Sequence, residues 1–190
     1  GCRYPGPETI RNPTGCPRSR GLYGHQIRNI VGEANLMAEG PMEDAVTIEK
    51  LLGRKPQGEY EVAVRRVDGT PRVIKNAPFL DDGTPMPTTY WLVDPEDRLR
   101  ISRLESTGAI DEAETEIGLD RLNESHLHYE EERNKAIGKD HKGPRPSGGV
   151  GGTRRGIKCL HAHYAWFLAG GNDPVGAWIE NRLKLEKEIN

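Results

Sequence analysis

The fold is decided by a stretch in which apolar and polar residues alternate before a tight-turn dipeptide, Tyr60-Glu61-Val62-Ala63-Val64-Arg65-Arg66-Val67-Asp68-Gly69-Thr70-Pro71-Arg72-Val73-Ile74. Alternation with a period of two residues is typical of a half-buried β-strand. The dipeptide Asp-Gly is favoured in hairpin turns because both residues tolerate a positive φ. The stretch therefore predicts an antiparallel hairpin.

The flanking segments extend this pattern in both directions. A turn signal at residues 81–85 leads to an apolar run at 88–93, which predicts a third strand. A helix is expected from residues 41–44 to Gly53, and further helices at about 95–107, 111–117, 119–137 and after Asn172-Asp173-Pro174. Nine of the nineteen residues from 138 to 156 are Gly or Pro, so no regular element is expected there. The sequence predicts an α+β fold, with a small antiparallel sheet in the N-terminal half followed by a helical C-terminal half.

Composition limits the domain organisation and the class of protein. With 190 residues and 34% hydrophobic residues, the chain has apolar material for one domain, expected over residues 41–190. Residues 1–40 are rich in Arg, Pro and Gly and are expected to be an irregular extension that could dock a protein partner. No apolar run long enough for a membrane span and no secretory signal is visible, and three cysteines make no disulfide framework. A cytoplasmic location is expected.

Soft metal-ligand chemistry concentrates in one segment, Lys158-Cys159-Leu160-His161-Ala162-His163. An extended strand would point Cys159, His161 and His163 to one face, whereas a helix would place Cys159 and His163 on one flank and His161 on the opposite flank. The apolar spacing of the surrounding residues favours the helix, so at most two of the three can share a transition metal such as zinc. The alternative is a buried helix whose cysteine and histidines belong to the core.

A glycine-rich loop, Ser147 to Gly156, precedes this segment and carries positive charge. Glycines allow the backbone to approach an anion closely, and a following helix offers free amides. The predicted anion-binding residues here are Gly151, Gly152, Arg154, Arg155 and Lys158. Replacing Arg154 and Arg155 together by alanine should then weaken anion binding by about tenfold or more; the alternative is a flexible linker.

A second candidate site lies on the helix expected at 119–137. His126, Tyr129, Glu130 and Arg133 share one face of this helix. His126 could act as a metal ligand or proton carrier, and Arg133 could hold an anion. An exposed helix joined by Glu–Arg pairs would explain the same pattern.

Several separated motifs occur in one order along the chain: Leu52-Gly53-Arg54-Lys55-Pro56, Asn76 to Leu92, His126-Leu127-His128-Tyr129 with Arg133, Gly149-Val150-Gly151-Gly152, Lys158 to His163, and Asn172-Asp173-Pro174-Val175-Gly176. Together they resemble the bacterial domain of unknown function 501 family over residues from about 45 to 185. By this resemblance, family motif positions fall on His126, Tyr129, Arg133, Lys158, Cys159 and His161. His163 falls where other members carry an apolar residue, and residues 1–40 depart from the family pattern.

Two functions of different classes remain open from the sequence. The first is a cytoplasmic protein that binds an anionic or phosphate-bearing small molecule beside a Cys/His cluster. If it is an enzyme, metal-assisted hydrolysis or group transfer would use Cys159, His161 and His126. The second is a non-catalytic interaction module that docks a protein or nucleic acid through its basic loop and N-terminal extension. A pI of about 6.4 and 6% aromatic residues argue against nucleic acid.

Overall fold

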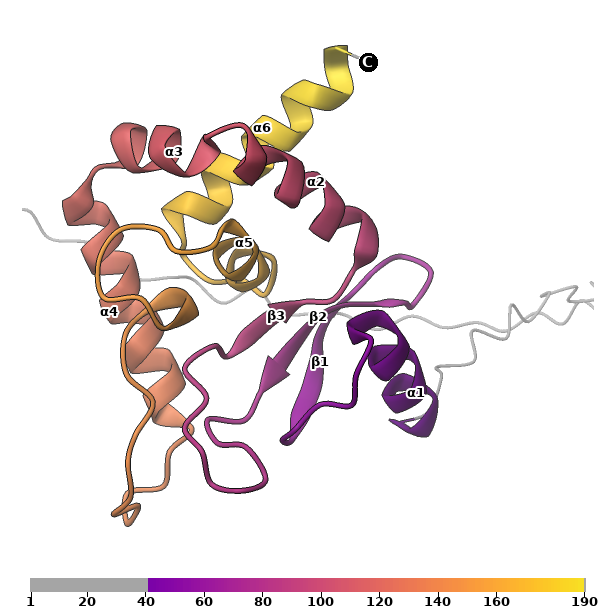
Figure 1. The fold of residues 1–190 in the computed structure, drawn as a ribbon, viewed down its shortest axis with the longest axis vertical. Helices are drawn as coiled ribbons and strands as arrows, with labels where there is room; N and C mark the ends of the chain where they lie inside the picture. The colour runs from indigo at the N-terminus through magenta and orange to yellow at the C-terminus, as the bar shows by residue number, and fades with distance from the viewer. Residues whose placement is uncertain (1–40, 190) are drawn as a thin grey trace, which may run out of the picture. The chain divides into compact units, whose positions relative to one another are not determined.

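The computed structural model describes residues 41–189, which form one antiparallel sheet followed by a mainly helical half (Figure 1). The elements are α1 (Pro41–Leu52), β1 (Tyr60–Arg65), β2 (Pro71–Asn76), β3 (Tyr90–Leu92), α2 (Pro95–Ser106), α3 (Ala109–Ile117), α4 (Leu119–Lys135), the 3₁₀ turn η1 (Val150–Gly152), α5 (Leu160–Leu168) and α6 (Pro174–Ile189). The predicted α+β fold is confirmed. The extension expected over residues 1–40 lies outside the described residues.

The sheet has the strand order β1-β2-β3, and both pairings are antiparallel. The hairpin turns at Gly69, whose φ of 89° is a conformation that glycine adopts without strain. In this turn, the Gly69 amide donates to the Arg66 carbonyl at 3.0 Å. The third strand is shorter than the apolar run 88–93 indicated.

The two faces of the sheet bury side chains in two different cores. Val73 of β2 packs into the main core, which also contains the apolar face of α5. The next residue, Ile74, points to the opposite face and packs with Ile48 of α1 and Val93. Because both faces are covered, adjacent residues of β2 are fully buried, as expected of a central strand.

Helix α2 leaves the sheet at a fixed point because Asp94 caps it. The Asp94 carboxylate accepts a hydrogen bond from the Asp97 amide at 2.9 Å, and Pro95 occupies the first helical position. Gly108 and Gly118, both with positive φ, then separate α2, α3 and α4. The helix boundaries predicted from these caps and glycines are therefore confirmed to within a few residues.

The segment between α4 and α5 contains only η1, as its glycines and prolines predicted. In Figure 1 it runs alongside α4 and returns to the start of α5.

Over residues 41–189, no helix combines the length and the apolar character needed to cross a membrane.

Candidate functional site

Cys159 and His161 meet because α5 begins one residue later than the cysteine. Cys159 is the N-cap residue and is extended, with φ −159° and ψ 120°, and the helix starts at Leu160. The Cys159 Sγ consequently lies 3.6 Å from the His161 Nδ1. The expectation that Cys159 would share a helix flank with His163 was wrong. The extended residue turns the thiol toward His161 instead.

Glu105, near the end of α2, completes the cluster. Its Oε1 accepts a hydrogen bond from the Leu160 amide at 2.7 Å and lies 3.2 Å from the His161 Nδ1. One ligand atom from each of Glu105, Cys159 and His161 lies within 4.8 Å of the other two. We call these three residues the Glu105/Cys159/His161 cluster. Sequence reasoning missed Glu105, whose only signal is its place on the α2 face that also carries Arg98 and Ser102.

Each ring nitrogen of His161 lies close to a hydrogen-bond acceptor. Its Nε2 lies 3.1 Å from the Arg98 carbonyl oxygen and 3.3 Å from the Ser102 Oγ. Carbonyl and carboxylate oxygens only accept, so Nε2 donates to the Arg98 carbonyl when it is protonated, and Nδ1 faces Glu105 and Cys159 either with its own proton or with a lone pair. Electron-rich atoms facing one another need a cation between them, either a proton or a metal ion.

The distances within the cluster suit both cations. A tetrahedral zinc ion with ordinary bond lengths separates its sulfur and nitrogen ligands by about 3.5 Å, and its nitrogen and oxygen ligands by about 3.3 Å. The observed separations are 3.6 and 3.2 Å.

Burial lowers the pKa of His161, but its hydrogen bond to Cys159 and the charges of Cys159 and Glu105 outweigh burial, so the pKa is raised above its ordinary value.

A pocket of about 810 Å³ opens beside the cluster. Its walls come from the end of α1, from β3, from one face of α2 and from the start of α5, and we call it the α2–α5 pocket. Its lining carries three cations and no carboxylate. The lining residues are Leu52, Arg54, Thr88, Tyr90, Trp91, Leu92, Pro95, Arg98, Leu99, Ser102, Gly151, Lys158, Cys159, His161 and Ala162.

The three cations of this pocket are engaged to different degrees. The Arg54 guanidinium lies over the Trp91 ring, 5.2 Å from its centroid. Arg98 donates to the Leu51 carbonyl at 3.1 Å and so caps the end of α1. Lys158 is exposed and makes no ion pair with the described residues. Lys158 is therefore the cation most available to a ligand.

His126 is not part of the cluster. It is buried on α4, where its Nε2 donates to the Gly156 carbonyl at 2.8 Å and its Nδ1 accepts from the Val150 amide at 3.2 Å. Both nitrogens are thus used by the neutral ring, and burial lowers the pKa of His126. In the structure, the residue predicted as a ligand or base holds the glycine loop against α4.

His163 lies in a second buried group. Its Nδ1 and the Asp173 Oδ2 are 2.7 Å apart, and its ring centroid is 5.7 Å from that of His126. Its Nε2 has no hydrogen-bond partner among the described residues. His163 is therefore tied to the start of α6, and the metal-ligand set predicted with it is not brought together.

Arg133 does not fit the role of an anion clamp. Its guanidinium is buried and donates to the carbonyls of Pro87, Pro146 and Gly148 at 3.2, 3.1 and 2.7 Å. These bonds fix the loop after α4, and burial lowers the pKa of Arg133. The side chain supports the loop from within the protein.

The glycine loop and the start of α5 have fewer free amides for binding an anion than the sequence indicated. The amides of Ile157 and Leu160 already donate to carboxylates of the protein, those of Glu114 at 2.6 Å and Glu105 at 2.7 Å. Of the predicted residues, Gly151 and Lys158 line the α2–α5 pocket. Gly152 packs near Pro87, while Arg154 and Arg155 are exposed outside the pocket lining. Anion binding by these two arginines stays a prediction.

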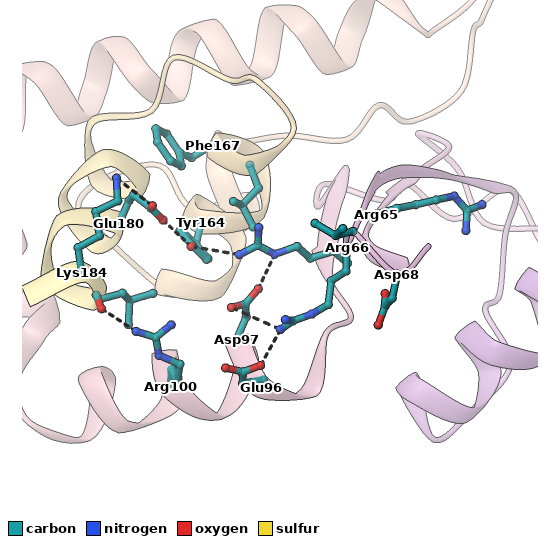
Figure 2. A pocket seen from close by; sticks show the side chains of 14 residues that line it. Arg65, Arg66, Asp68, Glu96, Asp97, Arg100, Tyr164, Phe167, Glu180 and Lys184 are labelled. Atoms are coloured by element: carbon teal, nitrogen blue, oxygen red, sulfur yellow. Dashed lines mark hydrogen bonds and ion pairs between the residues drawn. The ribbon is translucent and has the colours of Figure 1, made fainter. Parts of the chain in front are cut away.

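A second large pocket, of about 830 Å³, lies between the β1–β2 hairpin, α2 and α6. Its charges are largely paired with one another, as Figure 2 shows. Asp97 accepts from Arg72 at 2.6 Å, and Glu180 accepts from the Tyr164 hydroxyl at 2.7 Å. Lys184 also contacts Glu180 at 3.1 Å. Because acids neutralise most of its cations, this pocket attracts an anion less than the α2–α5 pocket does.

Comparisons with known proteins give one match. The model of a family described as protein of unknown function (DUF501) matches residues 62–181. This span contains all but the first two residues of the sheet, together with Glu105, Cys159 and His161. No curated protein and no solved structure matches the chain.

Proposed function

The chain belongs to the DUF501 family of proteins of unknown function, and we propose from its geometry that it binds a metal ion and an anionic small molecule side by side. In this proposal, the Glu105/Cys159/His161 cluster holds a transition metal such as zinc. The α2–α5 pocket beside it holds the anion.

One observation carries the proposal: the Nδ1 of His161 faces a carboxylate and a thiol, while its Nε2 faces a carbonyl. A metal-binding histidine usually donates its other N–H to a carbonyl or carboxylate, which orients the ring. The Arg98 carbonyl provides this acceptor, and Glu105 is itself fixed by the Leu160 amide. The ligands are therefore pre-oriented by their neighbours.

The exposure of the cluster favours a reactive site over a purely structural one. All three side chains are only partly buried, and Cys159 and His161 line the pocket. Three protein ligands leave a fourth tetrahedral position for water or a ligand, as in catalytic zinc sites. A metal there would polarise an ester or phosphoryl group, which supports metal-assisted hydrolysis or group transfer. A free thiol ligand suits a reducing cytoplasm.

Metal analysis of the purified chain tests this proposal. After dialysis against zinc and then buffer, we expect about one zinc ion per chain in the wild type and much less in Cys159→Ser and Glu105→Gln. His128→Gln, an exposed histidine on α4, is the control that should keep the metal. Zinc at a hundredfold excess over its Kd should also raise the free energy of unfolding by about 2.7 kcal/mol. Wild-type protein without stoichiometric metal would overturn the proposal.

A second candidate follows from the 3.6 Å contact between Cys159 Sγ and His161 Nδ1: a metal-free nucleophile and base, with the Arg98 carbonyl at Nε2 orienting the histidine. In EDTA, iodoacetamide should then alkylate Cys159 faster in the wild type than in His161→Ala, by about tenfold. If the wild type and His161→Ala are alkylated at equal rates and the wild type binds stoichiometric zinc, the nucleophile–base pair is rejected and the metal site is supported.

A further inference from the structure

We propose that the α2–α5 pocket selects an amphipathic organic anion, with a phosphate or carboxylate head group beside Ser102 and Lys158 and an apolar ring or chain beside Leu99 and Trp91. The proposal rests on the proposed function for the anionic head group. The selection of an apolar body is additional to that function.

One face of α2 sets the spacing of the groups that a ligand in this pocket would contact. Pro95, Arg98, Leu99 and Ser102 line the pocket at helical spacing, and Glu105 follows one turn later. With a rise of about 1.5 Å per residue, Pro95 and Ser102 are about 10 Å apart along the axis. Its apolar members, Pro95 and Leu99, precede Ser102, and the Arg98 guanidinium between them is held by the Leu51 carbonyl. A ligand along this face therefore meets apolar groups first and the Ser102 hydroxyl last.

The apolar end of the pocket lies where α1, β3 and the start of α2 meet. Leu52 and Trp91 pack against the small core under α1, yet both also line the pocket. Leu99 is 53% exposed and also lines the pocket. Covering such surface with an apolar group releases water and is favourable. Arg54, whose guanidinium lies over the Trp91 ring, also lines the pocket.

The polar end lies where α2 faces the start of α5. Ser102 Oγ, which contacts His161 Nε2 at 3.3 Å, and the exposed amine of Lys158 can both donate to an anion. Lys158 is the cation at this end, since Arg54 and Arg98 are engaged at the other, and no carboxylate lines the pocket to attract a positively charged head group. The chemistry therefore favours an anion at this end and an apolar body at the other.

Calorimetric titration with phenyl phosphate, inorganic phosphate and benzyl alcohol tests the proposal on the full chain. Phenyl phosphate should bind at least tenfold more tightly than inorganic phosphate, and benzyl alcohol should bind more weakly than either. Leu99→Gln, at a position exposed enough to tolerate glutamine, should bring phenyl phosphate to the affinity of inorganic phosphate. The same variant should leave the affinity for inorganic phosphate unchanged.

Charge variants locate the head group. If the head group binds beside Ser102 and Lys158, Lys158→Ala weakens both anions by about tenfold and the Arg154→Ala/Arg155→Ala double variant leaves both within twofold, whereas the anion site predicted at the glycine loop requires a loss of about tenfold or more in the double variant. The opposite ranking would support the glycine loop as the anion site and overturn the proposal. Equal affinities of phenyl phosphate and inorganic phosphate for the wild type would also overturn it, as would no binding at millimolar concentration.

Repeating the titrations in zinc and in EDTA separates this inference from the metal site. Selectivity for phenyl phosphate that persists in EDTA, in a chain that binds no zinc, would support the pocket and reject the metal. Stoichiometric zinc without selectivity for the phenyl group would reject the amphipathic ligand alone.

Discussion

At the scale of single residues, the approach of the glycine loop to α4 depends on Gly149. A Cβ built on Gly149 would lie 2.3 Å from the Cβ of His126 and 2.6 Å from its Cα. Neither atom can move without shifting the helix. This contact allows both nitrogens of His126 to bond to the loop.

Replacing Gly149 by alanine should therefore lower the free energy of unfolding by about 2–4 kcal/mol, because the methyl group must push the loop away from α4. Gly138→Ala is the matched control, since a Cβ there meets nothing within 4 Å and its φ is not positive. The control should change stability by less than about 0.5 kcal/mol. Urea denaturation measures both, and similar effects in the two variants would contradict the tight contact.

At the scale of elements, α2 supplies the pocket wall and one residue of the cluster, so its starting point matters for the site. Asp94 fixes that start through the Asp97 amide and also binds Arg66. Burial raises the pKa of Asp94, but the bonds to Arg66 and Asp97 outweigh it, so the pKa is lowered. The carboxylate is therefore both a helix cap and the partner of a guanidinium.

Asp94→Ala should cost about 2–3 kcal/mol, since it removes a cap worth about 1 kcal/mol and a charged hydrogen bond worth somewhat more. Asp94→Asn keeps a capping oxygen and loses the charge, so it should cost about half as much. Thermal unfolding gives both values. A loss of equal size in the two variants would show that the ion pair, not the cap, stabilises the start of α2.

At the scale of the whole molecule, the neutral state of His126 links folding to pH. Burial lowers its pKa, the nearby His163 lowers it further, and the Gly156 carbonyl and Asp173 oppose this effect. A base whose pKa falls on folding contributes its full stability above its ordinary pKa, near 6.5. This contribution is lost as the pH falls through the lowered value.

We therefore expect the free energy of unfolding to decline as the pH falls below about 6.5, because a protonated His126 can no longer accept from the Val150 amide. His126→Gln should be less stable at neutral pH and should show a smaller decline toward acid. His128→Gln, at an exposed position on the same helix, should keep the wild-type slope. Chemical denaturation between pH 5 and 8 gives the slopes, and an unchanged slope in His126→Gln would exclude this histidine as the cause.

Signals carried by neighbouring residues were sufficient for most of the fold. The alternation at Tyr60–Arg65, the turn at Gly69, the cap at Asp94 and the break at Gly118 each depend on a few adjacent residues. Periodicity and capping act over one turn or one strand, so they can be predicted from a single sequence. The same reasoning correctly found the segment in which Cys159 and His161 lie.

By itself, then, the sequence determined the elements, their order and the concentration of metal-ligand chemistry at the start of α5. Only the tertiary structure decided which side chains meet. It brought Glu105 to His161 across 56 positions in the sequence, because α2 packs against α5. It also placed His126 and Arg133 under the glycine loop, where both bond to backbone groups of the loop. Contacts of this kind depend on how helices pack, and the start of α5 one residue after Cys159 was enough to change the cysteine's partner.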